Sequence, residues 1–446
     1  MLPITRVPET IANGMGKFRA VFCREEGFEH VSRYVTGLII SPNKTLQGIY
    51  DLQVWDQQTP SRRAMHAGVF EAGWDDDALM QRHRAEVAGD YRGCGRTVIS
   101  LDWTLVHHER GPKIYAVSRT YDYVAHRTTL LQTVVTAVVA NRERLDGLDV
   151  VVQDPLNLHA EEAYLHATAK TSYEQMAAVR QRLLEVLHHQ LHRRLYRKRT
   201  ALAIDIVRQL EAERQFPQAD YAFDNGVLTV DLTRLIEQSG KHWVSELESS
   251  RHINWRGQWR RIDHVATELR EQHPESFRPV TITCRNGQEK QYWGFTKGVR
   301  LKKYGEKRVL IVHEQEDLQD TPRFFVTDAK HWESKRMLET WSYRWTSEVF
   351  HEFDKQVCGL EAAQVRKEEA VTRHFRLSCV AQSLIQRAPA VASKSERYAF
   401  AEGRITFGQK CRVISREVLR AMLALCQRYF AEGKTCDHVL ELLMPA

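Results

Sequence analysis

The sequence predicts an α/β fold: a sheet-centred core with an inserted β-rich unit, flanked by helical N- and C-terminal units. Two observations support this expectation. From Thr97 onward, apolar side chains alternate with polar ones, as in a strand with one face in a core. Amphipathic helical patterns stand before, between and after the predicted strands. Strands interleaved with helices are typical of α/β proteins.

The size and composition indicate a globular chain of several parts. With 446 residues it is long for one compact core, so two or three structural units are expected. No apolar run approaches the roughly 18 to 20 residues of a membrane helix, and the first residues do not resemble a secretory signal. We therefore expect a cytoplasmic protein with no membrane partner. The eight cysteines include no Cys-x-x-Cys pair and predict neither a zinc knuckle nor a disulfide framework.

A separate helical unit is predicted over residues 1–95, because apolar residues recur at helical spacing over 28–39 and a break follows at Pro42. The first part of the core is predicted over residues 96–250. Its opening strand places Asp102 on the face opposite Leu101 and its odd-numbered neighbours.

The rest of this first part leads to a second acidic residue. A short strand at 219–223 ends at Asp224, and Asn225-Gly226 supplies a turn. Asp224 is therefore expected at the carboxyl end of a strand, where ligands and catalytic groups gather in open α/β sheets. The other predicted elements are strands at 113–123, 130–139 and 242–249 and helices at 173–214 and 228–239.

An inserted β-rich unit over residues 251–308 is basic and aromatic, and the whole chain has a formal net charge of +7. Lysine and arginine neutralise phosphates, and aromatic rings stack on bases or insert between them. A solvated basic face is the alternative for any one such stretch. A basic run outside this unit, 188–199, adds to the indication of a DNA partner. The candidate DNA-binding residues of the inserted unit are Trp255, Trp293, Lys297, Arg300, Lys302 and Lys303.

The second part of the core is predicted over 309–387, with strands at 309–313 and 324–327 and a helix that Asp328 could cap. A helical unit over 388–446, with a possible role in dimerisation, completes the chain.

The most informative segment is 341–359, WSYRWTSEVFHEFDKQVCG. At about 100° per residue, one helical stripe would present an aromatic ring, a guanidinium, a carboxylate and an ammonium. By itself this pattern also suits a surface helix with an ordinary i, i+4 ion pair. The four residues of the stripe are Trp341, Arg344, Glu348 and Lys355.

This segment resembles the signature of cut-and-paste insertion-sequence transposases that carry a Tyr-Arg-Glu-Lys motif. Arg344, Glu348 and Lys355 stand at the spacing of that motif, and Trp341 departs from it because the family has a tyrosine there. VISLDWT resembles the family's first catalytic strand, and Asp224-Asn225-Gly226 resembles the segment of its second aspartate.

The resemblance implies an RNase H-like core and a DNA transposase whose catalytic and metal-binding residues are Asp102, Asp224 and Glu348. Two Mg²⁺ or Mn²⁺ ions would be its cofactors, because two ions can activate the attacking oxygen and stabilise the departing one. Double-stranded DNA, as transposon ends and target, would be its partner, bound in part by the 1–95 unit and gripped by Arg344, Lys355 and Trp341. A homodimer would form the active complex, in a cytoplasmic, nucleoid-associated setting.

Two other functions stay open at this point. The chain could be a domesticated transposase that binds DNA as a regulator and no longer cuts it. It could also be an RNase H-like nuclease that acts on nucleic acid without transposition.

Overall fold

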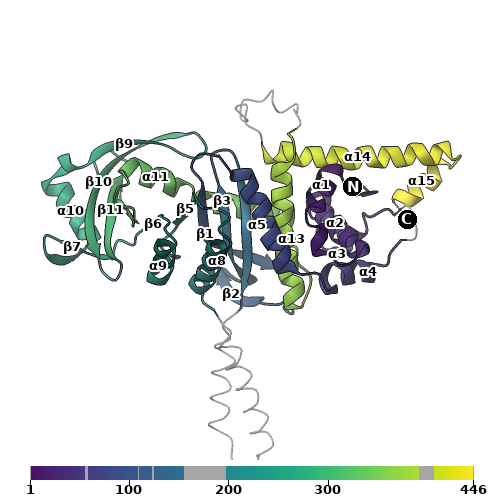
Figure 1. The fold of residues 1–446 in the computed structure, drawn as a ribbon, viewed down its shortest axis with the longest axis horizontal. Helices are drawn as coiled ribbons and strands as arrows, with labels where there is room; N and C mark the ends of the chain where they lie inside the picture. The colour runs from purple at the N-terminus through teal and green to yellow at the C-terminus, as the bar shows by residue number, and fades with distance from the viewer. Residues whose placement is uncertain are drawn as a thin grey trace, which may run out of the picture.

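A computed structural model describes residues 2–55, 59–108, 110–122, 125–154, 197–390 and 406–444 (Figure 1). Most of the helix predicted at 173–214, and most of the basic run at 188–199, lie outside these residues. The described N-terminal elements are α1 (Glu9–Gly16), η1 (Arg19–Val21), α2 (Glu25–Ile40), α3 (Leu46–Tyr50), α4 (Arg62–His66), η2 (Ala67–Glu71) and α5 (Asp76–Tyr91).

The protein is a mixed α/β protein built on one 12-stranded sheet. The strands run in the order β2-β3-β1-β5-β6-β12-β11-β10-β7-β8, with β4 paired to β3 and β9 paired to β10. Within it, β1, β5 and β6 are parallel neighbours, and the remaining pairs are antiparallel. The first six strands along the chain are β1 (Val98–His108), β2 (Ser118–Asp122), β3 (Arg127–Ala140), β4 (Leu145–Gln153), β5 (Asp220–Phe223) and β6 (Trp243–Glu246).

The opening strand of the core has the predicted alternation. In β1, Ile99 and Leu101 point into one apolar core, whereas Val98 and Val106 point into the other. The strands predicted at 130–139 and 219–223 are confirmed as β3 and β5. The one predicted at 113–123 is shorter, because only β2 is extended there.

β4 was not predicted. Its sequence, LDGLDVVVQ, carries two aspartates and a glycine, which are typical of a turn. Both aspartates are buried instead, because arginines neutralise them: Arg144 contacts Asp146 at 2.8 Å and Arg84 contacts Asp149 at 3.5 Å.

The basic and aromatic segment is rich in strands, and it also contains a helix, α10 (Ile262–Gln272), that was not predicted. Residue 308, a predicted boundary, lies inside β11, which pairs with β12 and so continues the sheet of the core. The strands of the basic and aromatic segment are β7 (His252–Trp255), β8 (Gln258–Arg261), β9 (Arg278–Thr283), β10 (Glu289–Leu301) and β11 (Gly305–His313), and β12 (Arg323–Thr327) follows them.

Helices cover both faces of the sheet and form two apolar cores. On one face lie α8 (Arg199–Glu213), α9 (Val230–Gln238) and α10. On the other lie α1 to α4 and, from the second part of the core, α11 (Ser334–Ser342), α12 (Trp345–Phe353), the π-helical turn η5 (Asp354–Cys358) and α13 (Glu368–Arg387), whereas α5 contributes side chains to both cores.

The expectation that Asp328 caps a helix was wrong. Its carboxylate accepts hydrogen bonds from the backbone N–H of Trp243 at 2.9 Å and lies 2.7 Å from the ring of His242. It therefore ties β6 to the end of β12, and α11 begins at Ser334 after Glu333, which makes no side-chain cap.

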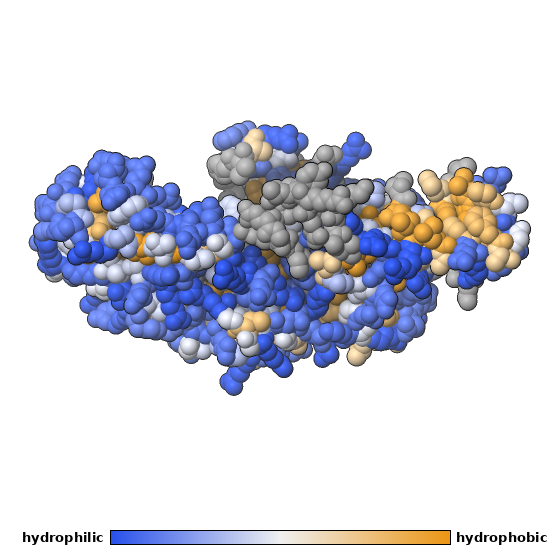
Figure 2. All heavy atoms as spheres, turned by 90° about the horizontal axis from the view of Figure 1, so that it is seen from above, coloured by the Kyte–Doolittle hydropathy of each residue, from blue (hydrophilic) through white to orange (hydrophobic). Residues whose placement is uncertain are grey.

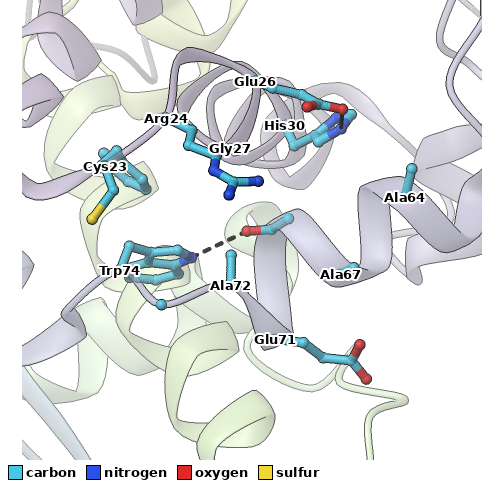
Figure 3. Close-up of a pocket in the computed structure, with 13 residues that line it drawn as sticks. Cys23, Arg24, Glu26, Gly27, His30, Ala64, Ala67, Glu71, Ala72 and Trp74 are labelled. Carbon is cyan, nitrogen blue, oxygen red and sulfur yellow. Dashed lines mark hydrogen bonds and ion pairs between the residues drawn. The ribbon is translucent and has the colours of Figure 1, made fainter.

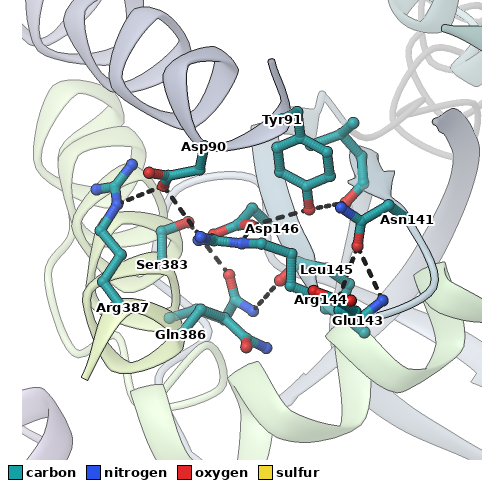
Figure 4. Close-up of polar contacts among 12 residues, drawn as sticks. Asp90, Tyr91, Asn141, Glu143, Arg144, Leu145, Asp146, Ser383, Gln386 and Arg387 are labelled. Atoms are coloured by element: carbon teal, nitrogen blue, oxygen red, sulfur yellow. Dashed lines mark hydrogen bonds and ion pairs between the residues drawn. The ribbon is translucent and has the colours of Figure 1, made fainter. Parts of the chain in front are cut away.

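A polar network joins three elements at one end of α13 (Figure 4). Asp90 of α5 contacts Arg387 of α13 at 2.7 Å and Arg144 of the β3–β4 turn at 3.1 Å. Arg144 in turn contacts Asp146, which accepts a hydrogen bond from Tyr91. The N-terminal helices are thus bonded to both the sheet and α13.

The chain ends in α14 (Phe407–Ala431) and α15 (Cys436–Leu443). Figure 2 shows apolar side chains gathered over these two helices. Among the described residues, no helix has the length and apolar character needed to cross a membrane. The large apolar side chains exposed on α14, on α15 and just after it are Leu419, Leu423, Phe430, Leu440 and Met444.

Candidate active site

Two parallel strands bring the first two acids together. β1 and β5 pair in the register Leu101 with Phe223, so Asp102 and Asp224 are the next residues along two neighbouring strands. Asp224 ends β5 and accepts hydrogen bonds from the backbone N–H groups of Gly226 at 2.9 Å and Val227 at 3.2 Å. This turn fixes the carboxylate at the strand's carboxyl end, as the sequence indicates.

The turn also requires its glycine. A Cβ at Gly226 would meet the ring of Trp103 at 2.8 Å, and Trp103 is held on the far face of β1 beneath Arg199. A side chain at position 226 would therefore have to displace this indole.

Helix α12 carries the third acid and is fixed over β1 by small polar side chains. Ser347 lies 2.6 Å from Ser100, two residues before Asp102 on the same face of the strand. His351 lies 2.7 Å from Thr136, the residue of β3 that pairs with Asp102. Glu348 stands between these two anchors.

The prediction that residues 341–359 form one helix with a single polar stripe was wrong in one respect. The helix is interrupted at Tyr343 and Arg344, and Trp341 belongs to α11 rather than to α12. Its ring packs 4.9 Å from that of Phe325 in an edge-to-face contact, beside the guanidinium of Arg323. Trp341 therefore lines a neighbouring groove and does not line the cavity of the acids.

The other three residues of the stripe do meet the two aspartates. They line an open cavity of about 520 Å³. Arg344 reaches across it: its guanidinium donates to Glu348 at 2.6 Å and lies 3.5 Å from Asp102. The lining residues are Asp102, Trp103, Thr104, Asp224, Arg344, Glu348, His351, Glu352 and Lys355.

Lys355 enters the cavity from a π-helical turn. α12 gives way to η5, in which Asp354 is fully buried and accepts a hydrogen bond from Ser378 at 2.6 Å. The Lys355 ammonium donates to the backbone carbonyl of Leu105 at 2.6 Å, near the end of β1. The turn thus directs Lys355 back toward the strand that carries Asp102.

The surroundings of the cavity shift the pKa values of two of its side chains, Asp102 and His351. Burial, followed by the charge of Asp224, raises the pKa of Asp102 to about 7, and Glu348 adds to the rise. The backbone N–H of Trp103 and the guanidinium of Arg344 act in the opposite direction. Burial lowers the pKa of His351 to about 3, so its ring is neutral at pH 7. A strongly perturbed carboxyl in an open cavity is typical of a functional site.

The donor set suits a hard divalent cation in kind, because the three acids offer only carboxylate oxygens. Their spacing is not that of a closed cage: within the described ranges, no three His, Cys, Asp or Glu side chains are close enough to hold a metal ion. The cation found between Asp102 and Glu348 is the guanidinium of Arg344. It lies between the two carboxylates and partly balances their charge.

The predicted DNA-binding residues of the inserted unit divide into two groups. Trp255 is 4% exposed and packs in the core, with Lys297 over its ring at 4.4 Å, and Trp293 is half-buried. The ring of Trp255 is therefore not free to stack on a base in this arrangement. The basic side chains Lys297, Arg300, Lys302 and Lys303 are exposed.

Two other tryptophans are the exposed ones. Trp259 in β8 is 45% exposed and Trp345 at the start of α12 is 59% exposed. Trp345 also borders the groove that contains Trp341, which has a volume of about 600 Å³ and shares Arg344 with the acid cavity. In the sequence, the position of Trp345 directly after Arg344 was the one feature that could have indicated its place beside the site. The cations along this groove are Arg285, Lys290, Arg323 and Arg344.

A separate cavity of about 550 Å³ lies among the N-terminal helices (Figure 3). The side chain of Arg24 extends over it, and Trp74 forms one wall with its indole N–H donating to the carbonyl of Gly68 at 3.2 Å. None of the predicted site residues lines this cavity.

Comparison with known proteins adds no relative: no protein-family model matches the chain, and no curated protein matches it.

Proposed function

We propose that this chain is a metal-dependent DNA transposase that binds the ends of its element, cleaves phosphodiester bonds and joins 3′-hydroxyl ends to target DNA. One observation carries the proposal. Asp102 and Asp224 end up side by side on parallel strands, and α12 brings Glu348, Arg344 and Lys355 into the same cavity from 120 or more residues further along the chain. The sequence resemblance selected these five residues together with Trp341, which lies outside the cavity.

The sheet supports an RNase H-like core within this proposal. The order β4-β3-β1-β5-β6 has antiparallel pairs on one side of β1 and parallel pairs on the other, which is the order of such a sheet. The segment between Asp224 and Glu348 then adds strands β7 to β12 to its edge, as an inserted β-rich unit would.

The cavity provides distinct roles for its residues. Bound at the three carboxylates, two Mg²⁺ or Mn²⁺ ions would activate the attacking oxygen and stabilise the departing one. Arg344 would leave its bridge between Asp102 and Glu348 and donate to a phosphate oxygen, a ligand that suits its planar fork. Lys355 would hold a second phosphate as a point charge, and the buried, neutral ring of His351 keeps α12 in place on β3.

The surfaces around the cavity support a DNA partner. The groove beside it carries four cations and the exposed ring of Trp345, and Lys297, Arg300, Lys302 and Lys303 are further exposed cations on and just beyond β10. The exposed apolar side chains of α14 and α15 offer a face for a second copy of the chain. A paired complex would hold two element ends at once.

Substituting Asp224 or Glu348 by Ala is expected to abolish cleavage and leave DNA binding largely intact, because each removes a metal ligand without removing a cationic contact. Losing a metal's stabilisation costs several kcal/mol, which is on the order of 1000-fold or more in rate. The assay uses Mg²⁺ and a labelled duplex that carries the sequences on both sides of the coding region. Strand-transfer products separate a transposase from a plain nuclease. Binding without any nicking by the unsubstituted chain would show a silent regulator.

Substituting Arg344 or Lys355 by Ala is expected to weaken both binding and cleavage. Each loss removes one phosphate contact, so the slope of log affinity against log salt should become shallower by about 1. Fluorescence anisotropy over a salt series measures this slope. An unchanged slope would mean that the side chain serves only the fold.

A further inference from the structure

The ammonium of Lys355 is held at the edge of the acid cavity by a contact outside it. Its ion pair is with Glu361, at 3.3 Å, and its hydrogen bond is with the carbonyl of Leu105, at 2.6 Å. Four carboxylates line the same cavity, those of Asp102, Asp224, Glu348 and Glu352, yet the ion pair of Lys355 is with none of them. A lysine stem is long and flexible, so its head group takes a defined place only where neighbours fix it.

Glu361 is itself fixed to β1. One of its oxygens, Oε1, accepts a hydrogen bond from the backbone N–H of His107 at 3.2 Å and lies 3.3 Å from the Nδ1 atom of the same residue. The other ring nitrogen of His107 lies 2.7 Å from the buried carboxylate of Asp122 in β2. Because the backbone contact does not depend on the imidazole tautomer, Glu361 stays tied to the strand that carries Asp102.

We propose that Glu361 is a positioning residue: with His107 and Asp122 behind it, it holds Lys355 on the β1 side of the cavity, where a backbone phosphate can meet the ammonium. Without it, the carboxylates that line the cavity attract Lys355 inward, into the place that the proposed divalent ions would take. This inference rests on the proposed function, since it assigns Lys355 to a phosphate of the DNA that is cut.

The test compares Glu361→Gln, Lys355→Ala and the double variant, on the flanking-sequence duplex described above. Glu361→Gln keeps the shape and removes the charge that holds Lys355. We expect cleavage to slow by roughly 10- to 100-fold, as for a misplaced catalytic contact, and the salt slope to become shallower toward that of Lys355→Ala, because the displaced ammonium no longer meets its phosphate. In the Lys355→Ala background, Glu361→Gln should cause no further loss.

Two further variants sharpen the result. Glu432→Gln is the matched control: it removes one carboxylate from an exposed contact with Arg428 on α14 and should leave cleavage unchanged. His107→Ala removes the ring contact to Glu361 and keeps the backbone one, so it should slow cleavage less than Glu361→Gln does.

The outcomes separate the inference from the function it rests on. Full cleavage by Glu361→Gln, or an additional loss of the same size in the Lys355→Ala background, overturns the positioning role while the transposase proposal stands. Absence of cleavage by the unsubstituted chain overturns both. Thermal melting of each variant shows that it is folded, which is expected because the Glu361 side chain is 34% exposed.

Discussion

Replacing Asp102 by Asn is expected to abolish cleavage and, at pH 8, to make the protein more stable. The folded chain raises the pKa of this carboxyl to about 7, chiefly by burial and the charge of Asp224, whereas an unfolded chain has about 3.9. Folding therefore favours the protonated acid. As the pH rises from about 4 to about 7, the unfolded chain gives up this proton first, so the stability of the folded state falls through that window.

The asparagine carries no charge, so the variant escapes this loss. At pH 8 it should be more stable than the unsubstituted protein by at most about 4 kcal/mol, and near pH 4 the two should be equal. Urea unfolding at both pH values measures the difference. Adding Mg²⁺ should raise the melting temperature of the unsubstituted chain more than that of Asp102→Asn, because the variant lacks one of the three proposed carboxylate ligands.

Asp51→Asn serves as the control, because Asp51 is exposed and its carboxylate accepts a hydrogen bond from the side chain of the neighbouring Gln47. It makes the same change in net charge and should shift stability by about 0.5 kcal/mol or less. Equal stability of Asp102→Asn and the unsubstituted chain at pH 8 would contradict the idea of a destabilised carboxylate cavity.

The second large effect is expected at Arg84, which is fully buried in α5. Its guanidinium forms two hydrogen bonds to Glu213 of α8, at 2.8 and 2.6 Å, and lies 3.5 Å from Asp149 of β4. Arg84→Met keeps much of the volume and leaves two buried carboxylates without their cation. Breaking a buried ion pair in this way costs about 3 to 5 kcal/mol.

The midpoint of urea unfolding measures this loss, and Arg82→Ala is the matched control. Arg82 lies on the same helix, is 53% exposed and pairs with Glu86. Such surface pairs contribute about 0 to 1 kcal/mol, so the control should remain close to the unsubstituted protein. A loss of similar size in both variants would mean that the Arg84 network adds nothing beyond an exposed pair.

The two aspartates could be located from the sequence because the residues next to each of them in the chain form a recognisable local pattern. VISLDWT alternates strictly, so Asp102 could be assigned to one face of β1, and Asp224-Asn225-Gly226 is a turn by composition alone. The register between β1 and β5, which makes the two acids neighbours, depends on tertiary packing and no local pattern indicates it.

The helix break before Arg344 could not be predicted, because Tyr343 and its neighbours suit a helix. Tyr343 is 6% exposed, and its carbonyl accepts a hydrogen bond from the side chain of Thr346, which lies against Ser100 of β1. The break is thus imposed by the sheet below it. β4 and α10 were missed for a related reason: partners distant in sequence neutralise the aspartates of β4, and the basic segment around α10 favoured strands.

The position of α13 limits how this chain can change over generations. Most of its residues are buried, between β4 on one side and the N-terminal helices on the other. The ring of His374 joins Tyr34 of α2 to the carbonyl of Gly359, just after the turn that carries Lys355, with both contacts at 2.8 Å. A foreign N-terminal unit grafted in place of this one would leave α13 uncovered. The N-terminal unit and the sheet are therefore expected to change together, and variation in the N-terminal helices is expected to arise by substitution rather than by their exchange.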